Sequence, residues 1–251
     1  AENLAHRHRM YRLLTNEVNA AVKAAFDSGA DDVIVNDNHG SGYNIFFEDL
    51  DPRCRIIHGR NSSGPAWLNL LDASVDAMVL IGMHAMAGTP AAITSHSLWD
   101  VNNGEFFMSE GSMAAALAGD FDVPTVFVSG DDKITAEIAE KIPEIEVAVV
   151  KQALAPHMAC SVIPAKAHQM IYEGVKKGLA KRKEIPPYKL KGPLTLSLYD
   201  SPGHIPPFKQ LNKAENCNTI TEAFVECQKD MPWTNYGSQQ PDGFVFPNVF
   251  E

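Results

Sequence analysis

Short apolar segments alternate with amphipathic helical segments along most of the chain, and this alternation limits the fold more than any other feature of the sequence. Residues 77–82 form an uncharged apolar run, which is typical of a strand covered on both faces in a parallel sheet. Further strands are expected at residues 32–36, 55–58, 124–129 and 147–150. Because helical segments separate these strands, the pattern predicts an α/β fold with a mostly parallel, Rossmann-like central sheet flanked by helices.

Helical spacing of apolar side chains is clear in residues 10–28, and Gly29 follows where that helix should stop. Further helices are expected at residues 66–72, 108–118, 133–141 and 163–183. Pro186 and Pro187 break the last of these, and a strand at 194–199 and a helix at 221–229 follow. This change of character predicts a smaller C-terminal α+β section.

Composition favours a soluble enzyme rather than a nucleic-acid-binding or membrane protein. The chain has 251 residues, of which 45% are hydrophobic, enough for an extensive core. No apolar stretch has the length of a membrane span, and the formal net charge of −10 argues against a nucleic-acid partner. The four cysteines show no Cys-x-x-Cys spacing and no signal peptide is visible, which favours reduced thiols in a cytoplasmic protein.

Metal-binding side chains fall where expected strands run out into loops. His39, His84 and His96 are three of the nine histidines, and each occupies such a position. Glu110 begins an apolar helical run and can bring a carboxylate to the same edge of the sheet. Two imidazoles and a carboxylate suit a first-row metal, zinc above all. Any one of these histidines alone is more often a plain loop or core residue, so the argument depends on their shared placement.

Five further polar residues have candidate roles near these positions. Asp37 either orients the His39 imidazole or caps the loop that follows. Asp132 is expected to cap a helix rather than to bind an amine. Lys151 is either solvated or placed to meet a substrate carboxylate, and Ser95 and Ser97 can help to hold the His96 tautomer. No Gly-x-Gly-x-x-Gly motif follows a strand, so no nucleotide cofactor is expected.

Several motifs occur in the order and spacing of one known family. They are Thr15-Asn-Glu-Val-Asn-Ala-Ala, Val35-Asn-Asp-Asn-His-Gly-Ser, Gly82-Met-His-Ala-Met-Ala-Gly-Thr, Ser95-His-Ser, Ser109-Glu-Gly, Val128-Ser-Gly-Asp-Asp and Val150-Lys-Gln. From about residue 10 to about residue 179 the chain resembles the zinc D-aminopeptidases of the DppA type. The resemblance implies that His39, His84 and Glu110 are zinc ligands and that His96 is the catalytic residue, either as a nucleophile or as a general base acting on water.

The chain departs from this family at its beginning. The family's remaining zinc ligands are an Asp and a Glu in an N-terminal Ser-x-Asp-x-Glu-Gly motif, which the sequence lacks. We therefore expect the chain to begin inside the fold, after the first strand, with zero or one zinc ion held here and two in the full-length protein. His6 and His8 lie in a polar lead-in and are not expected to replace the missing ligands.

The expected domains are a metal-binding catalytic α/β domain at residues 1–160, lacking its first strand, and the smaller α+β section at 161–251. The aromatic tail is expected to pack against the core or a neighbouring subunit; its aromatic residues are Trp233, Tyr236, Phe244, Phe246 and Phe250. The resemblance implies a metalloprotease of the aminopeptidase class that hydrolyses short D-peptides and forms a homo-oligomer, as a ring-like decamer. The alternatives are a metal-dependent amidase on the same fold and a binding or assembly protein without a metal site.

Overall fold

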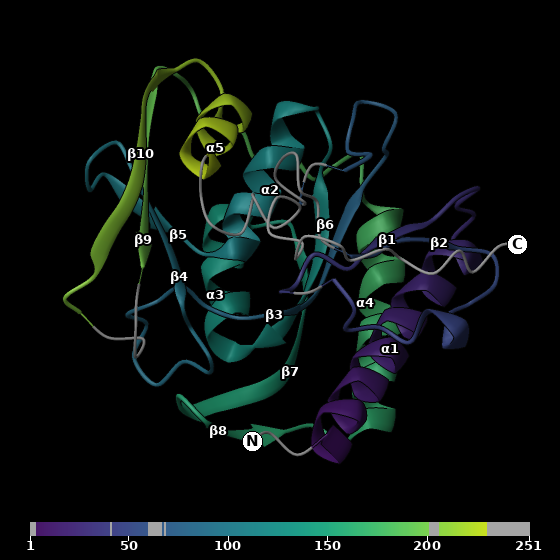
Figure 1. The fold of residues 1–251 in the computed structure, drawn as a ribbon. Helices are drawn as coiled ribbons and strands as arrows, with labels where there is room; N and C mark the ends of the chain where they lie inside the picture. Colours follow the sequence, from purple (N-terminus) through teal and green to yellow (C-terminus); the bar gives the residue numbers. More distant parts are fainter. Residues whose placement is uncertain (1–3, 41, 60–66, 68, 201–205, 230–251) are drawn as a thin grey trace, which may run out of the picture.

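A computed structural model describes residues 4–40, 42–59, 67, 69–200 and 206–229 (Figure 1). The helices are α1 (Leu4–Asp27), η1 (Phe47–Asp49), α2 (Glu110–Asp120), α3 (Asp132–Lys141), α4 (Pro164–Ala180) and α5 (Ile220–Gln228). The strands are β1 (Ile34–Asn36), β2 (Arg55–Ile57), β3 (Met78–Met83), β4 (Ser97–Val101), β5 (Phe106–Met108), β6 (Thr125–Asp131), β7 (Glu146–Ala155), β8 (Met158–Ser161), β9 (Leu194–Asp200) and β10 (Lys209–Cys217).

The predicted parallel sheet is confirmed in the first part of the chain. Strands β3, β6 and β7 are parallel neighbours, and β8 joins the edge of β7 in the antiparallel sense. Strands β1 and β2 form a separate parallel pair. Because parallel strands end at the same edge of their sheet, the segments that follow β3 and β6 leave it side by side.

Helices cover this sheet closely. Helix α4 packs against β6 and β7 and also against α1, and α3 packs against the same two strands. A Cβ atom at Gly174 would lie 2.3 Å from the Phe127 ring, and one at Gly178 would lie 2.4 Å from the Val126 carbonyl oxygen. The absence of side chains at these two glycines therefore lets α4 lie directly on β6. The resulting core includes Phe127, Ile134 and Ile171, all fully buried.

A second sheet with its own core lies beside the first (Figure 1). It is antiparallel, in the order β10-β9-β4-β5, and α5 packs against β9 and β10. Helix α2 contributes to both cores, since Ala115 belongs to the first and Leu117 to the second. The site described below depends on this shared helix and on the junction between the two sheets.

The sequence did not predict four strands, namely β4, β5, β8 and β10. Strands β4 and β5 precede residue 160, but β4 pairs with β9, which follows it, so the antiparallel sheet draws on both halves of the chain. The domain division at residue 160 stays a prediction. The helix expected at 66–72 falls partly outside the described residues, and the aromatic tail falls wholly outside them. In the part of the chain that is described, no helix is long and apolar enough to cross a membrane.

Candidate metal centre

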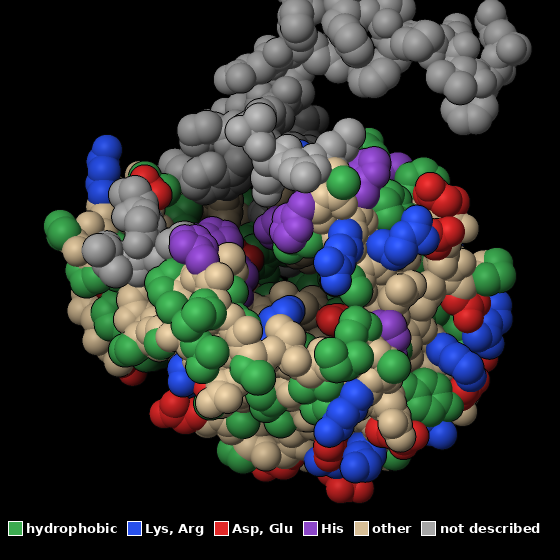
Figure 2. Space-filling model, turned by 90° about the horizontal axis from the view of Figure 1, so that it is seen from below, with side chains coloured by type: hydrophobic (Ala, Val, Ile, Leu, Met, Phe, Trp, Pro, Cys, Tyr) green, Lys and Arg blue, Asp and Glu red, His purple; other side chains and the backbone are tan. Residues whose placement is uncertain are grey.

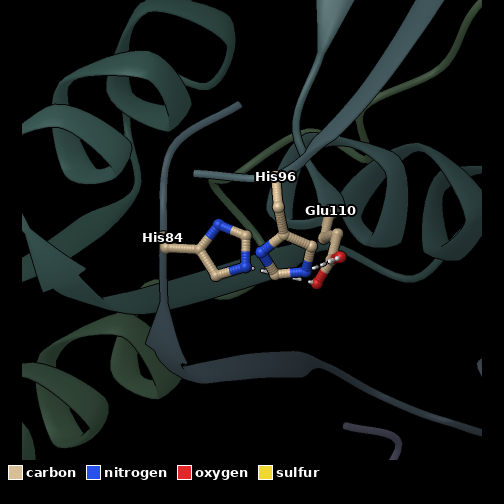
Figure 3. A group of neighbouring side chains, drawn as sticks. All are labelled: His84, His96 and Glu110. Atoms are coloured by element: carbon tan, nitrogen blue, oxygen red, sulfur yellow. Dashed lines mark ion pairs between the residues drawn. The ribbon is translucent and has the colours of Figure 1, made fainter. Parts of the chain in front are cut away.

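His84, His96 and Glu110 meet at the carboxyl end of β3 (Figure 3). The His84 Nε2 atom lies 3.7 Å from Glu110 Oε2, and the His96 Nε2 atom lies 3.5 Å from Glu110 Oε1. The two imidazole rings face each other with centroids 4.5 Å apart. One ligand atom from each residue lies within 4.8 Å of the others, which is close enough for the three to share one ion. Figure 2 looks onto this side of the molecule and shows a hollow bordered by histidine side chains.

The position of His84 depends on a close contact between β3 and β6. The pairing register shifts between Leu80 and Met83, where Gly82 has φ +72°, so the strand is irregular just before His84. A Cβ atom at Gly130 on β6 would lie 2.3 Å from the Met83 carbonyl oxygen. Glycine at position 130 therefore allows the end of β3, and with it His84, to lie against β6.

Glu110 is the first residue of α2, directly after the N-cap residue Ser109. Glu137 of α3 holds this helix end, because its Oε1 atom accepts hydrogen bonds from the Ser109 hydroxyl (2.6 Å), the Ser109 backbone N–H (3.2 Å) and the Ser112 hydroxyl. The Ser97 hydroxyl donates to Glu110 Oε1. The Glu110 carboxylate is thus fixed both at its backbone and at one of its oxygens.

The strand-end position expected for His96 is wrong. His96 directly precedes β4, so it lies at the start of a strand and belongs to the second sheet. The reason is that Ser97–Val101 pairs with both β5 and β9, a non-local pairing that local sequence patterns do not reveal. The site is therefore built across the junction of the two sheets, with His84 from one and His96 from the other.

The backbone fixes the tautomers of both imidazoles. His84 Nδ1 lies 3.0 Å from the Ala85 carbonyl oxygen, and His96 Nδ1 lies 2.6 Å from the Thr94 carbonyl oxygen. A carbonyl only accepts hydrogen bonds, so each Nδ1 carries a proton, and Nε2 is the atom that each ring turns toward the Glu110 carboxylate. The His96 tautomer is held by Thr94 and not by the serines beside it, since the Ser97 hydroxyl bonds Glu110.

Two imidazole nitrogens and a carboxylate that face one another form a set of ligands suited to a metal cation. His84 Nε2 is buried and has no hydrogen-bond partner in the described structure. The separations of 3.5 and 3.7 Å to the carboxylate are too long for hydrogen bonds. Two ligands of a tetrahedral zinc ion lie roughly 3.3 Å apart, given zinc–ligand bonds of about 2.0–2.1 Å. Donor types, spacing and the buried lone pair therefore fit zinc.

His39 does not belong to this group of three. It lies in the loop after β1, is exposed, and its Nδ1 atom is 3.5 Å from the Asn44 amide oxygen. Buried Asp37 accepts hydrogen bonds from the Asn44 backbone N–H (2.6 Å), the Asn44 amide (2.9 Å) and the Ile45 N–H (3.2 Å). Asp37 therefore caps the loop, and it reaches His39 only through Asn44. The expected ligand role of His39 stays a prediction.

The helix cap expected at Asp132 is wrong by one residue. The N-cap of α3 is Asp131, whose Oδ1 atom accepts from the backbone N–H groups of Lys133 (2.8 Å) and Ile134 (3.0 Å). Asp132 instead accepts from the Ala153 N–H at 2.7 Å and pairs with Lys133 at 2.9 Å. It thus ties the start of α3 to β7.

Sequence reasoning missed three groups that shape the centre: Ser97 as a partner of Glu110, Glu137, and the Thr94 carbonyl. Ser109-x-x-Ser before an apolar helix is a local capping signal, and it marks the start of α2. Nothing in the local sequence connects Glu137 to that cap, because the contact spans 28 residues. His8 packs its ring edge-on against Phe46 with centroids 6.0 Å apart, which agrees with a non-ligand role. All four cysteines, Cys54, Cys160, Cys217 and Cys227, are free thiols, as expected.

Comparisons with known proteins agree with this geometry. A D-aminopeptidase from Bacillus subtilis (strain 168) is 30% identical over 180 residues, which is 70% of this chain and 65% of the relative. The chain thus spans just under two thirds of that relative's length. The structure also resembles the "Zn-dependent D-aminopeptidase DppA from Bacillus subtilis, a self-compartmentalizing protease", with a TM-score of 0.76, 26% identity, and coverage of 86% of this chain and 84% of the other. The model of the D-aminopeptidase family Peptidase_M55 matches residues 2–224, and the chain therefore belongs to that family.

Proposed function

We propose that this protein is a zinc-dependent D-aminopeptidase that releases N-terminal D-amino acids from short peptides. The observation that carries the proposal is the meeting of two Nε2 lone pairs and a carboxylate at one point, with His84 Nε2 buried and unpartnered among the described residues. Membership of the D-aminopeptidase family and the zinc dependence of the structural relative support it.

The proposed ligands are His39, His84 and Glu110, with His96 as the catalytic residue. The side chains of His84 and Glu110 are 15% and 21% exposed, whereas that of His96 is 43% exposed. The two more buried groups suit ligation, and the more exposed one suits contact with an arriving substrate. Zinc bound here would supply a Lewis acid that polarises the scissile carbonyl and activates water at neutral pH.

The chain's own groups position the reacting atoms. Because Nδ1 of His96 faces the Thr94 carbonyl, the reacting atom of the proposed catalytic residue is Nε2, which would take a proton from water or attack a carbonyl carbon. The Ser97 hydroxyl bonds Glu110 Oε1 and leaves Oε2 facing His84. One oxygen of Glu110 is therefore reserved for orientation and the other for the metal.

We also propose that the protein assembles into a homo-oligomer, with a ring-like decamer as the specific form, and that it acts in the cytoplasm. Support for assembly comes from the description of the structural relative as self-compartmentalizing. Size-exclusion chromatography with light scattering measures the subunit number, and a monomer at micromolar concentration would contradict the assembly.

Activity on matched peptides tests the function. D-alanyl-D-alanine should be hydrolysed and L-alanyl-L-alanine should not, and removal of zinc by a chelator should abolish hydrolysis until zinc is restored. The variant His96→Ala is the control for contaminating peptidases, because it should be inactive in the same preparation. Equal hydrolysis of the D- and L-peptides, or activity that survives metal removal, would contradict the proposal.

A further inference from the structure

A second group of titratable side chains lies at the same sheet edge, outside the proposed ligands. The pairing register places Met83 opposite Gly130, and the adjacent residue Asp131 opposite Lys151 on β7. His84 follows Met83, so Lys151 lies two strands away from it, near the same edge. Two strand spacings amount to about 10 Å. The view of this side in Figure 2 shows that the hollow has both a basic and an acidic side chain along its wall.

Lys151 differs from the other lysine at this edge. The Lys133 ammonium pairs with Asp132 at 2.9 Å. Within the described ranges, the Lys151 ammonium has no carboxylate at ion-pair distance and no hydrogen bond to another side chain. An ammonium on a partly buried strand position without a fixed partner is available to bind an anion.

Two further titratable groups, on helices α1 and α4, belong to this neighbourhood through Glu17. Glu17 of α1 lies close enough to feel the charges of Lys151 and of His168 on α4, although burial dominates and raises the pKa of Glu17. His168 Nε2 is buried and has no hydrogen-bond partner in the described part of the chain. Glu17 therefore lies within electrostatic range of both Lys151 and His168, and no hydrogen bond or ion pair joins these three side chains in the described part of the chain.

We propose that Lys151 binds the C-terminal carboxylate of the short peptide substrate, and that Glu17 is its internal competitor for the ammonium. This inference rests on the proposed aminopeptidase function. An extended peptide advances by about 3.5 Å per residue. The four-carbon lysine stem covers part of the 10 Å separation. A carboxylate one or two residues beyond the scissile bond is therefore within reach, which selects dipeptides and tripeptides over longer chains.

The charges of Lys151 and Glu17 are predicted to have opposite effects on the affinity for the substrate carboxylate. A charge-assisted hydrogen bond in a partly buried site contributes a factor of about 10 to 100 in affinity. Replacing Lys151 removes that contact, whereas replacing Glu17 by glutamine removes the competing negative charge. If Lys151 and Glu17 mattered only for folding, their replacement would affect peptides ending in a free carboxylate and peptides ending in a neutral amide equally.

Hydrolysis of D-alanyl-D-alanine and of its C-terminal amide tests the proposal. The variant Lys151→Met should lower kcat/KM for the acid about 10- to 100-fold and leave the amide within about twofold. Lys151→Arg should retain part of the preference for the acid, and Glu17→Gln should increase it. Lys133→Met is the matched control at the same edge and should change both substrates equally. Equal losses on acid and amide in Lys151→Met would overturn the proposal.

Binding without chemistry separates this inference from the proposed function. Calorimetric titration of the metal-free protein with the same two peptides should give tighter binding of the acid, and Lys151→Met should remove the difference. If wild-type protein hydrolyses the amide but binds both peptides equally, the aminopeptidase function stands and the Lys151 assignment fails. If it hydrolyses neither peptide yet binds the acid through Lys151, the function fails and the binding site stands.

Discussion

Glu137 on α3 accepts the Ser109 hydroxyl at 2.6 Å, and this contact joins the helix that carries Glu110 to the main sheet. Ser109 and Ser112 are fully buried, so their hydroxyls have no access to water if Glu137 is lost. The orientation of a proposed metal ligand is therefore set by a residue that follows it by 27 positions.

Replacing Glu137 by alanine should destabilise the protein and weaken zinc binding together. The two serine hydroxyls, 3.0 Å apart, would keep a hydrogen bond to each other, but a buried hydroxyl donor and the Ser109 N–H would lose their acceptor, at about 1–3 kcal/mol each. Competition with a chromogenic chelator measures zinc affinity, and urea unfolding measures stability. Glu137→Gln keeps a hydrogen-bond acceptor, so it should lose less stability and less zinc affinity than Glu137→Ala. Exposed Glu140 on the same helix supplies the control Glu140→Ala, and equal behaviour of the two alanine variants would show that the cap does not matter.

Loss of His84 and loss of His96 should have different effects on metal content. His84→Ala should lose zinc and activity, because it removes a buried ligand. His96→Ala should lose activity but retain most of its zinc, since the more exposed imidazole is proposed to act on the substrate. Metal analysis of the dialysed variants gives the answer. Equal loss of zinc in both would make His96 a ligand.

Gly130→Ala should be strongly destabilising, by about 2 kcal/mol or more, and should reduce zinc content. Its Cβ atom would lie 2.3 Å from the Met83 carbonyl oxygen, and backbone cannot move aside as a side chain can. Gly111→Ala is the matched control, because its Cβ would meet only the side-chain tips of Ile134 and Ile138 at 3.3 Å. Thermal unfolding compares the two, and a Gly130→Ala protein as stable as Gly111→Ala would contradict the close-contact argument.

Glu17→Gln should stabilise the protein at neutral pH and have little effect under acidic conditions. Burial raises the pKa of Glu17 in the folded state above 4.5, so the folded protein holds this proton more tightly than the unfolded chain. Wild-type stability therefore falls as pH rises from the unfolded pKa through the folded one. The difference in Tm between variant and wild type should grow over that range and then remain constant.

Exposed Glu173 on α4 provides the comparison for this experiment. Glu173→Gln should show no growing difference in Tm over the same pH range. A Glu17→Gln protein that follows Glu173→Gln at every pH would show that the Glu17 carboxylate is effectively solvated.

The sequence predicted the part of the fold that depends on local patterns. Strand β3 is apolar throughout and β6 has the apolar centre Val126–Phe127–Val128 because helices cover both faces of the sheet, and that composition is visible without a structure. Strand β4 was missed because one of its partners, β9, is distant in the sequence, and β10 was missed because its composition is mixed and its pairing with β9 is irregular. The β8 strand was missed because it is a short edge strand with exposed polar residues.

The dependence on local patterns also explains which residues of the candidate site the sequence predicted and which it did not. His84 and Glu110 were identified because each stands at the end of a locally recognisable element. The start of β4 beside His96, and the partners of Glu110 on other elements, depend on tertiary contacts that leave no local signal. The prediction that His39 follows a strand was correct. That strand, β1, belongs to the separate β1–β2 sheet, so the strand order of the main sheet could not predict how far His39 lies from His84 and Glu110.

Strand β4, which directly follows His96, borders β9, which is formed by residues almost one hundred positions later in the chain. During synthesis, a ribosome-bound chain that has not reached residue 194 can form the β4–β5 hairpin but lacks the strand on its other side. His84 and His96 are therefore brought to their final separation only after residues 194–200 have been synthesised and have paired with β4.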